Sequence, residues 1–289
     1  MNGIIGRISA WKNGRGPVVA VFCLAGLLAQ PLAGQAGDTA LQPHLAVYDL
    51  SLAGAEDLSG IASATGRMVI ELDGSRCEGW TLNFRLVVQY GLRSGKGRLL
   101  DSRSNSWESG DGGELRYARR QYVDNSLQEE TLLTARRGEG DQPGTIAMSK
   151  PQEESFALAA GAAFPVAHQT SLNRAARAGE KRNRAMIFDG ADDAVAYDAI
   201  AFIGEETGGH DFSGSIEGSG VAALAALRAW PVSISYYKHG GSGEETPAYQ
   251  VSFLMFDNGV SGDIRLDYGD LALAGKLSRL DFHTASPCP

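Results

Sequence analysis

Cysteine is scarce in this sequence. The 289 residues include three cysteines, Cys23, Cys77 and Cys288. None of them has a second cysteine nearby in sequence, so the short motifs of metal-binding or redox-active cysteines are absent. The role of each cysteine must therefore be inferred from its position relative to the ends of the chain.

A hydrophobic run long enough to cross a membrane is also missing at the N-terminus. The apolar run at residues 18–29 has about 12 residues, whereas a transmembrane helix needs roughly 20. A basic stretch without acidic residues precedes it, and a stretch of small residues follows. This order is typical of a secretory signal peptide. We predict a signal peptide over residues 1–36, cleaved after Ala36, and one exported, non-membrane-spanning domain over residues 37–289.

The chain has no excess of basic residues. It contains 26 Lys and Arg against 34 Asp and Glu, a formal charge of −8. Loss of the three basic residues of the signal peptide leaves 23 against 34, a formal charge of −11. Such an acidic chain without a basic stripe is not expected to bind nucleic acid or anionic lipid head groups.

Removal of the signal peptide leaves an even number of cysteines. Cys77 and Cys288 then remain, and a pair of this kind in an oxidising compartment is typical of a disulfide. The bond would fasten the C-terminal tail, which has little apolar content, to an early strand. A reactive thiol and a metal ligand are the rival interpretations.

Alternating apolar and polar residues dominate the rest of the chain. The clearest case is residues 79–90, where Trp80, Leu82 and Phe84 share a face opposite Asn83 and Arg85. Asn258-Gly259 between two alternating runs predicts a hairpin with a type I′ turn. Further strands are predicted over residues 44–52, 66–74, 102–109, 113–123, 126–137, 144–150, 182–190, 195–204, 230–238, 246–259, 260–269 and 271–282.

One segment has the pattern of a helix. Residues 164–181 place Pro165 at the expected start and Gly179 at the expected C-cap. The pattern turns Val166, Leu172, Ala175 and Ala176 inward, and Gln169, Asn173 and Arg177 towards water. Residues 205–220 are predicted as a surface loop, and residues 221–230 fit a short helix or a buried strand equally. The fold class is therefore all-β with one main helix, which would plug or cover an open edge of the sheet or the mouth of a barrel.

Catalytic and metal-binding motifs are absent from the sequence. The five histidines lack metal-ligand spacing, and Ser235 and Lys238 of an S-x-x-K match lie in a predicted strand, which sends them to opposite faces. We predict no catalytic residues, no cofactor and no metal. An enzyme would need at least two of four polar residues in one cleft, and we expect all four to lie apart. They are Glu78, His168, His239 and Asp267.

Several blocks of the sequence resemble the EipB-type cell envelope integrity family of periplasmic proteins. The most specific are R-C-E-G-W at residues 76–80 and D-N-G-V with L-D-Y-G at residues 257–269. The resemblance implies a periplasmic, monomeric protein with a many-stranded antiparallel sheet, wound as a β-spiral or open broken barrel, with one helix inside or against it. It also implies a disulfide between Cys77 and Cys288 and no enzymatic activity.

These observations favour one function over two alternatives. The favoured hypothesis is a non-enzymatic periplasmic protein that supports envelope integrity by binding a periplasmic protein or an outer-membrane lipid or lipoprotein. The first alternative is an uncharacterised envelope hydrolase. The second is a lipid or lipoprotein carrier, suggested by a sheet that curls around a helix.

Overall fold

The computed structural model describes residues 41–56, 60–191, 194–208, 210, 216–241, 246–285 and 288. The predicted signal peptide, residues 1–36, lies outside this range, as do parts of the predicted loop at residues 205–220. Residues 38–289 belong to one compact unit. The strands are β1 His44–Ala55, β2 Ile61–Ser75, β3 Gly79–Leu92, β4 Gly97–Glu108, β5 Glu114–Val123, β6 Ser126–Arg136, β7 Gly144–Lys150, β8 Glu154–Leu158, β9 Arg182–Ile187, β10 Tyr197–Ile203, β11 Ala229–Lys238, β12 Tyr249–Phe256, β13 Ser261–Asp267 and β14 Leu271–Phe282, and the helices are α1 Pro165–Arg177 and α2 Val221–Ala225.

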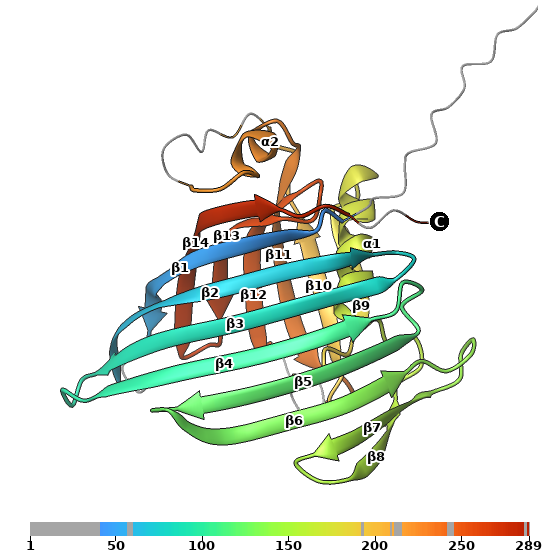
Figure 1. Cartoon of the computed structure of the whole chain (residues 1–289), viewed down its shortest axis with the longest axis horizontal. Coiled ribbons are helices and arrows are strands. Elements are labelled where there is room, and N and C mark those ends of the chain that lie inside the picture. Colours follow the sequence, from blue (N-terminus) through green and yellow to red (C-terminus); the bar gives the residue numbers. More distant parts are fainter. Residues whose placement is uncertain are drawn as a thin grey trace, which may run out of the picture. The chain divides into compact units, whose positions relative to one another are not determined.

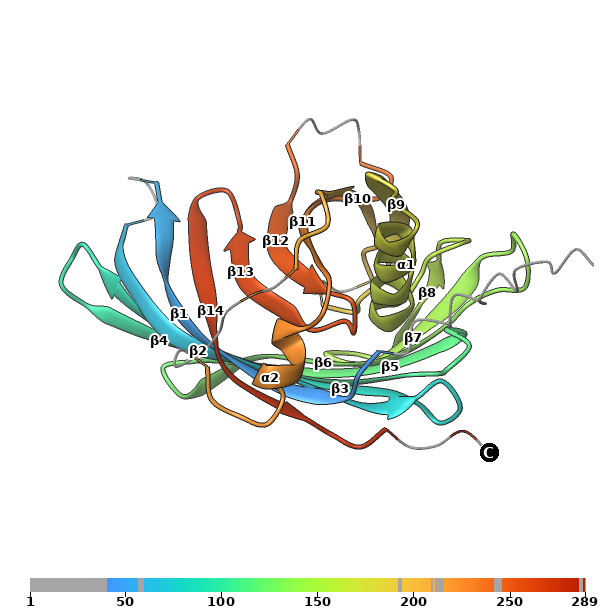
Figure 2. The same ribbon diagram turned by 90° about the horizontal axis from the view of Figure 1, so that it is seen from above.

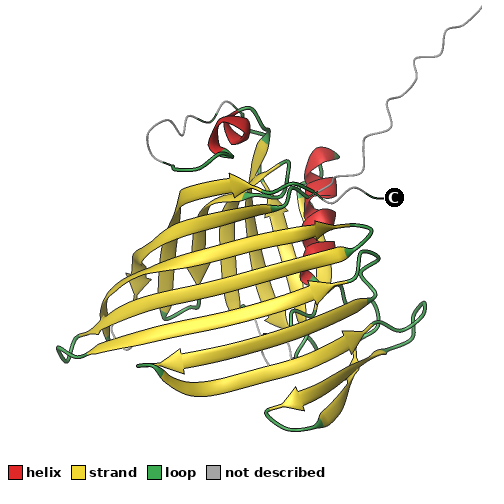
Figure 3. Cartoon of the chain, in the orientation of Figure 1, coloured by secondary structure: helices red, strands yellow, loops and turns green. Residues whose placement is uncertain are grey.

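All fourteen described strands form one antiparallel sheet (Figures 1 and 3). Two ladders of sequential strands, β1 to β8 and β9 to β14, meet where β1 pairs with β14. The strands at the two ends of the sheet are β8 and β9, so the sheet is not closed. This architecture confirms the prediction of an open, many-stranded antiparallel fold with one main helix.

Residue alternation separates an inner from an outer face of the sheet. On β3, Leu86 and Val88 are buried whereas Arg85 and Gln89 are exposed, as the sequence pattern predicted. The largest cluster of buried side chains lies on the inner face and includes Tyr48, and the Tyr48 hydroxyl donates a hydrogen bond to the Ser261 carbonyl at 2.5 Å. Burial of apolar side chains along successive strands is the main force that holds such a curved sheet together.

Helix α1 lies against the two ends of the sheet (Figure 2). Leu172 in its C-terminal half packs with Ile187 of β9 and with Trp230 of β11. Its N-cap residue Phe164 packs with side chains of β5 to β8. Ala163, immediately before the helix, forms a parallel bridge with Ile187. The helix and its entry therefore protect the β9 edge, as expected for a single helix in an all-β chain.

The structure corrects the predicted turn at Asn258-Gly259. The hairpin between β12 and β13 exists, but only Gly259 has a positive φ, of 87°. The Phe256 amide donates to the Val260 carbonyl and the Gly259 amide donates to the Phe256 carbonyl, so the loop has three residues, one more than a type I′ hairpin. Two consecutive positive φ values occur instead at Asp124 and Asn125, between β5 and β6. Asp and Asn tolerate this conformation better than other residues with a side chain.

Three other expectations about local structure also change. The structure contains an additional strand, β8, which was not predicted from the sequence. The ambiguous segment 221–230 contains both the short helix α2 and the start of β11. Asn173, expected to face water, is fully buried. Arg177 is exposed, as expected, and its guanidinium reaches across to Asp257.

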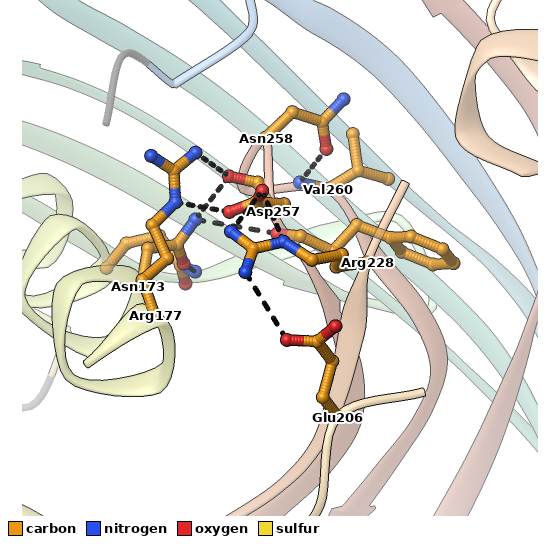
Figure 4. A network of polar contacts seen from close by, with 9 residues as sticks. Asn173, Arg177, Glu206, Arg228, Asp257, Asn258 and Val260 are labelled. Carbon is orange, nitrogen blue, oxygen red and sulfur yellow. Dashed lines mark hydrogen bonds and ion pairs between the residues drawn. The ribbon is translucent and has the colours of Figure 1, made fainter. Parts of the chain in front are cut away.

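Asn173 belongs to a polar network that joins α1 to the β12–β13 turn (Figure 4). Its Nδ2 donates to the carbonyls of Phe256 and Asp257 at 3.4 and 3.2 Å. The Asp257 carboxylate accepts hydrogen bonds from Arg177 on α1 and from Arg228 before β11. The Asn173 amide thus joins α1 to the β12–β13 turn, and the Asp257 carboxylate of that turn joins α1 to the segment before β11.

We expect Asn173→Ala to lower the free energy of unfolding by about 2 kcal/mol, because two carbonyls at a buried site lose their donor. Urea unfolding at neutral pH measures this change. Arg174→Ala is the matched control, since Arg174 is exposed on the same helix and should cost less than about 0.5 kcal/mol. Equal destabilisation by the two substitutions would contradict the role given to the amide.

Neither of the two helices in the described part of the chain is long and apolar enough to cross a membrane.

Candidate functional site

The structure joins Cys77 and Cys288 by a disulfide that closes a separation of 211 positions. Cys77 lies in the turn between β2 and β3, and Cys288 lies in the tail that follows β14. Both cysteines are exposed. The bond therefore fastens the tail to an early hairpin at a place that small reductants can reach.

A groove lies beside this disulfide, and we call it the terminal groove. Its volume is about 460 Å³, and Cys288 is one of its lining residues. The apolar part consists of Leu41, Trp80 and Val166, which belong to one small hydrophobic cluster. Polar residues from α1 and from the β2–β3 and β4–β5 turns complete the lining. An apolar surface with a few polar groups is typical of ligand-binding sites.

Glu108 at the end of β4 lies under the terminal groove and caps helix α1. Its two carboxylate oxygens accept hydrogen bonds from the backbone amides of Val166 and Ala167, both at 2.8 Å. A carboxylate at a helix N-terminus satisfies amides that have no partner within the helix. Glu108 is only 3% exposed, and this burial raises its pKa to about 7, opposed by the two helix amides and by Arg137.

The rim of the terminal groove depends on a close approach between two turns. A Cβ atom at Gly110 would lie 1.7 Å from the carbonyl oxygen of Arg76, so only glycine allows the β4–β5 turn to meet the β2–β3 turn. On the opposite side, Arg174 of α1 lines the groove and forms no ion pair with any described residue. The guanidinium is thus available to an anionic or carbonyl group of a ligand.

The four polar residues that an enzyme would need belong to different parts of the fold. His239 contacts Asp198 at 3.0 Å, and Asp267 pairs with Arg265 at 3.1 Å. His168 is buried on α1, where its Nε2 has no hydrogen-bond partner in the part of the chain that the structure describes, and burial lowers its pKa to about 4. Glu78 is exposed in the β2–β3 turn. Within the described ranges, no hydrogen bond or ion pair joins any two of these four residues.

Arginines on β5 pair with neighbouring carboxylates. Arg116 pairs with Glu114 at 2.7 Å, and Arg120 pairs with Glu130 at 2.7 Å. The strand that contains Ser235 and Lys238 is β11, and the Ser235 hydroxyl accepts a hydrogen bond from Gln250 of the adjacent strand. Neither feature forms a catalytic arrangement.

One group among the described residues has the composition of a metal site. Glu71, Asp73 and His283 each place a potential ligand atom within 4.8 Å of the others. Sequence reasoning missed this group and Glu108 alike, because their partners come from distant segments. The one sequence feature that could have drawn attention to Glu108 is its position next to Trp107, at the end of a predicted strand.

Comparison with known proteins identifies the family. The EipB-like family matches residues 35–284. The chain is 33% identical over 278 residues to the cell envelope integrity protein EipB of Brucella abortus (strain 2308), and the match covers 96% of this chain and 95% of the relative. A crystal structure of a β-barrel-like protein of domain of unknown function DUF1849 from Brucella abortus superimposes with a TM-score of 0.77 at 33% identity, covering 84% of this chain and 99% of that one. The chain therefore belongs to the EipB-like family.

Proposed function

We propose that this protein is a monomeric, non-enzymatic periplasmic factor that supports cell envelope integrity by binding an envelope protein or lipid in the terminal groove. The name of the Brucella relative supports the envelope role. The observation that carries the binding proposal is the terminal groove itself, where Trp80 and Val166 form an apolar floor beside Arg174, which has no ion-pair partner among the described residues. The signal peptide predicted from the sequence over residues 1–36 fits the proposed location.

The two alternatives receive less support from the contacts. Tyr48, Phe256 and Leu273 are fully buried on the inner face of the sheet. A lipid carrier of the half-open barrel type would need that space for acyl chains, so a bound chain would have to use the terminal groove instead. A hydrolase would need polar residues that converge, whereas His239 and Asp267 are engaged in separate pairs.

A pull-down from crosslinked periplasm tests the proposal. The double variant Thr170→Trp, Arg174→Glu fills the terminal groove and reverses the charge at position 174 without removing a core side chain. We expect it to recover at least about tenfold less partner than the wild-type chain, because buried central contacts dominate binding energy. Lys150→Glu, an exposed charge reversal on β7, is the matched control and should leave recovery unchanged.

Native mass spectrometry of the purified protein distinguishes the two kinds of partner. A lipid would appear as an added mass that the double variant lacks, and a protein partner would appear in the crosslinked fraction alone. Equal recovery by wild type and double variant, with no added mass on either, would contradict binding in the terminal groove.

A further inference from the structure

We propose that Glu71, Asp73 and His283 form a binding site for a zinc ion that holds the C-terminal tail against β2. The three residues come from only two segments. Glu71 and Asp73 lie two positions apart on one face of β2, and His283 is the first residue after β14. One potential ligand atom from each lies within 4.8 Å of the other two.

The backbone around this group is held in place before any ion binds. The His283 amide donates to the Pro43 carbonyl at 2.9 Å, and the Gln42 side chain donates to the His283 carbonyl at 2.8 Å. Asn83 of β3 donates to one oxygen of Glu71 at 3.1 Å. Such outer hydrogen bonds orient ligands in metal sites.

The charge balance of the sheet points separately to a cation. Several other carboxylates on the strands have an arginine partner, as in the pairs Asp49–Arg67 and Asp281–Arg279. No Lys or Arg among the described residues forms an ion pair with Glu71 or Asp73. The imidazole of His283 lies beside both carboxylates, and its Nδ1 is 2.6 Å from Asp73 Oδ1. A divalent cation would neutralise both carboxylates at once.

The type of ligand selects the ion. One imidazole nitrogen with two carboxylate oxygens suits Zn²⁺, whereas Mg²⁺ and Ca²⁺ prefer oxygen alone. Ligand atoms around tetrahedral zinc lie about 3.3 Å apart, so small rotations of these half-buried side chains would close the group around the ion. Asp73 and His283 are 44% and 30% exposed at their side chains, which leaves the fourth position to water.

The site would act on the same segments as the disulfide. Cys77 follows β2 by two residues, and Cys288 follows His283 by five. The ion would therefore secure the tail to β2 independently of the redox state of the cysteines. Its loss is expected to matter most when the disulfide is reduced.

Titration calorimetry with ZnCl₂ tests the proposal, on oxidised protein without a polyhistidine tag. We expect one zinc ion per chain, a raised melting temperature, and at least about tenfold weaker binding in His283→Gln and in Asp73→Asn. His239→Gln is the matched control, because His239 also contacts a single carboxylate, Asp198, but has no third ligand in the described structure. It should leave zinc binding unchanged.

Three outcomes would overturn the proposal. The first is the absence of saturable zinc binding by the wild-type protein. The second is equal affinity in wild type and His283→Gln, with circular dichroism showing that both are folded. The third is Ca²⁺ or Mg²⁺ binding at the same site as tightly as Zn²⁺, which would remove the role of the imidazole.

Discussion

Replacement of both Cys77 and Cys288 by serine should lower the free energy of unfolding by about 2–5 kcal/mol. The disulfide closes a separation of 211 positions, and the chain-entropy model assigns a loop of this length roughly 5 kcal/mol at 25 °C. Native domains have a net stability of about 5–15 kcal/mol, so a large share would be lost. Urea unfolding of the oxidised wild type and of the double variant measures the difference.

A reductant supplies the control for this experiment. Because both cysteines are exposed, a phosphine reductant should lower the wild-type melting temperature towards that of the double variant. The double variant should not respond to it. Identical melting of the oxidised and reduced wild type would show that the bond contributes nothing to stability.

The wild-type free energy of unfolding should fall by about 3 kcal/mol between pH 4.5 and pH 7 through Glu108 alone. Burial raises the pKa of this carboxyl from 4.5 to about 7. The folded chain therefore retains a proton that the unfolded chain releases in this range, and a rising pH favours the unfolded chain. Below pH 4.5 both states hold the proton and the effect disappears.

Glu108→Gln isolates this contribution, because glutamine does not titrate. The free energy of unfolding of the variant, relative to that of the wild type, should rise between pH 4.5 and pH 7. The loss of one hydrogen bond from a helix amide adds a constant difference that does not change with pH. Glu114→Gln gives the opposite sign at lower pH, because hydrogen bonds from Arg116 and Arg136 lower the pKa of Glu114 below 4.5, so that the wild type loses this stabilisation as the pH falls below about 4.5. A pH-independent difference between wild type and Glu108→Gln would contradict the assignment.

The fold could be predicted largely from local patterns. Alternation along β3 located its buried and exposed faces, and Pro165 with the following apolar spacing located α1. These signals are readable because each depends on residues that are neighbours in the chain. β8 was not predicted, because its five residues are too few for an alternating pattern of apolar and polar residues to be distinguished from the turns on either side.

The contacts of the candidate sites could not be predicted in the same way. Asn173 has the polarity of a surface residue, and only the distant carbonyls of Phe256 and Asp257 explain its burial. Asp73 and His283 are 210 positions apart, so no spacing motif could join them. Their proximity follows from the pairing of β1 with both β2 and β14.

That central pairing has a consequence for the order of assembly. The ribosome makes β1 early and β14 last. Within each of the two ladders, every strand after the first pairs with the strand that precedes it in sequence, so each ladder can form as soon as its own strands are present. The seam between β1 and β14 must wait for the final segment of the polypeptide. A chain truncated before residue 271 would thus keep two half-sheets with unpaired central edges, each open to aggregation.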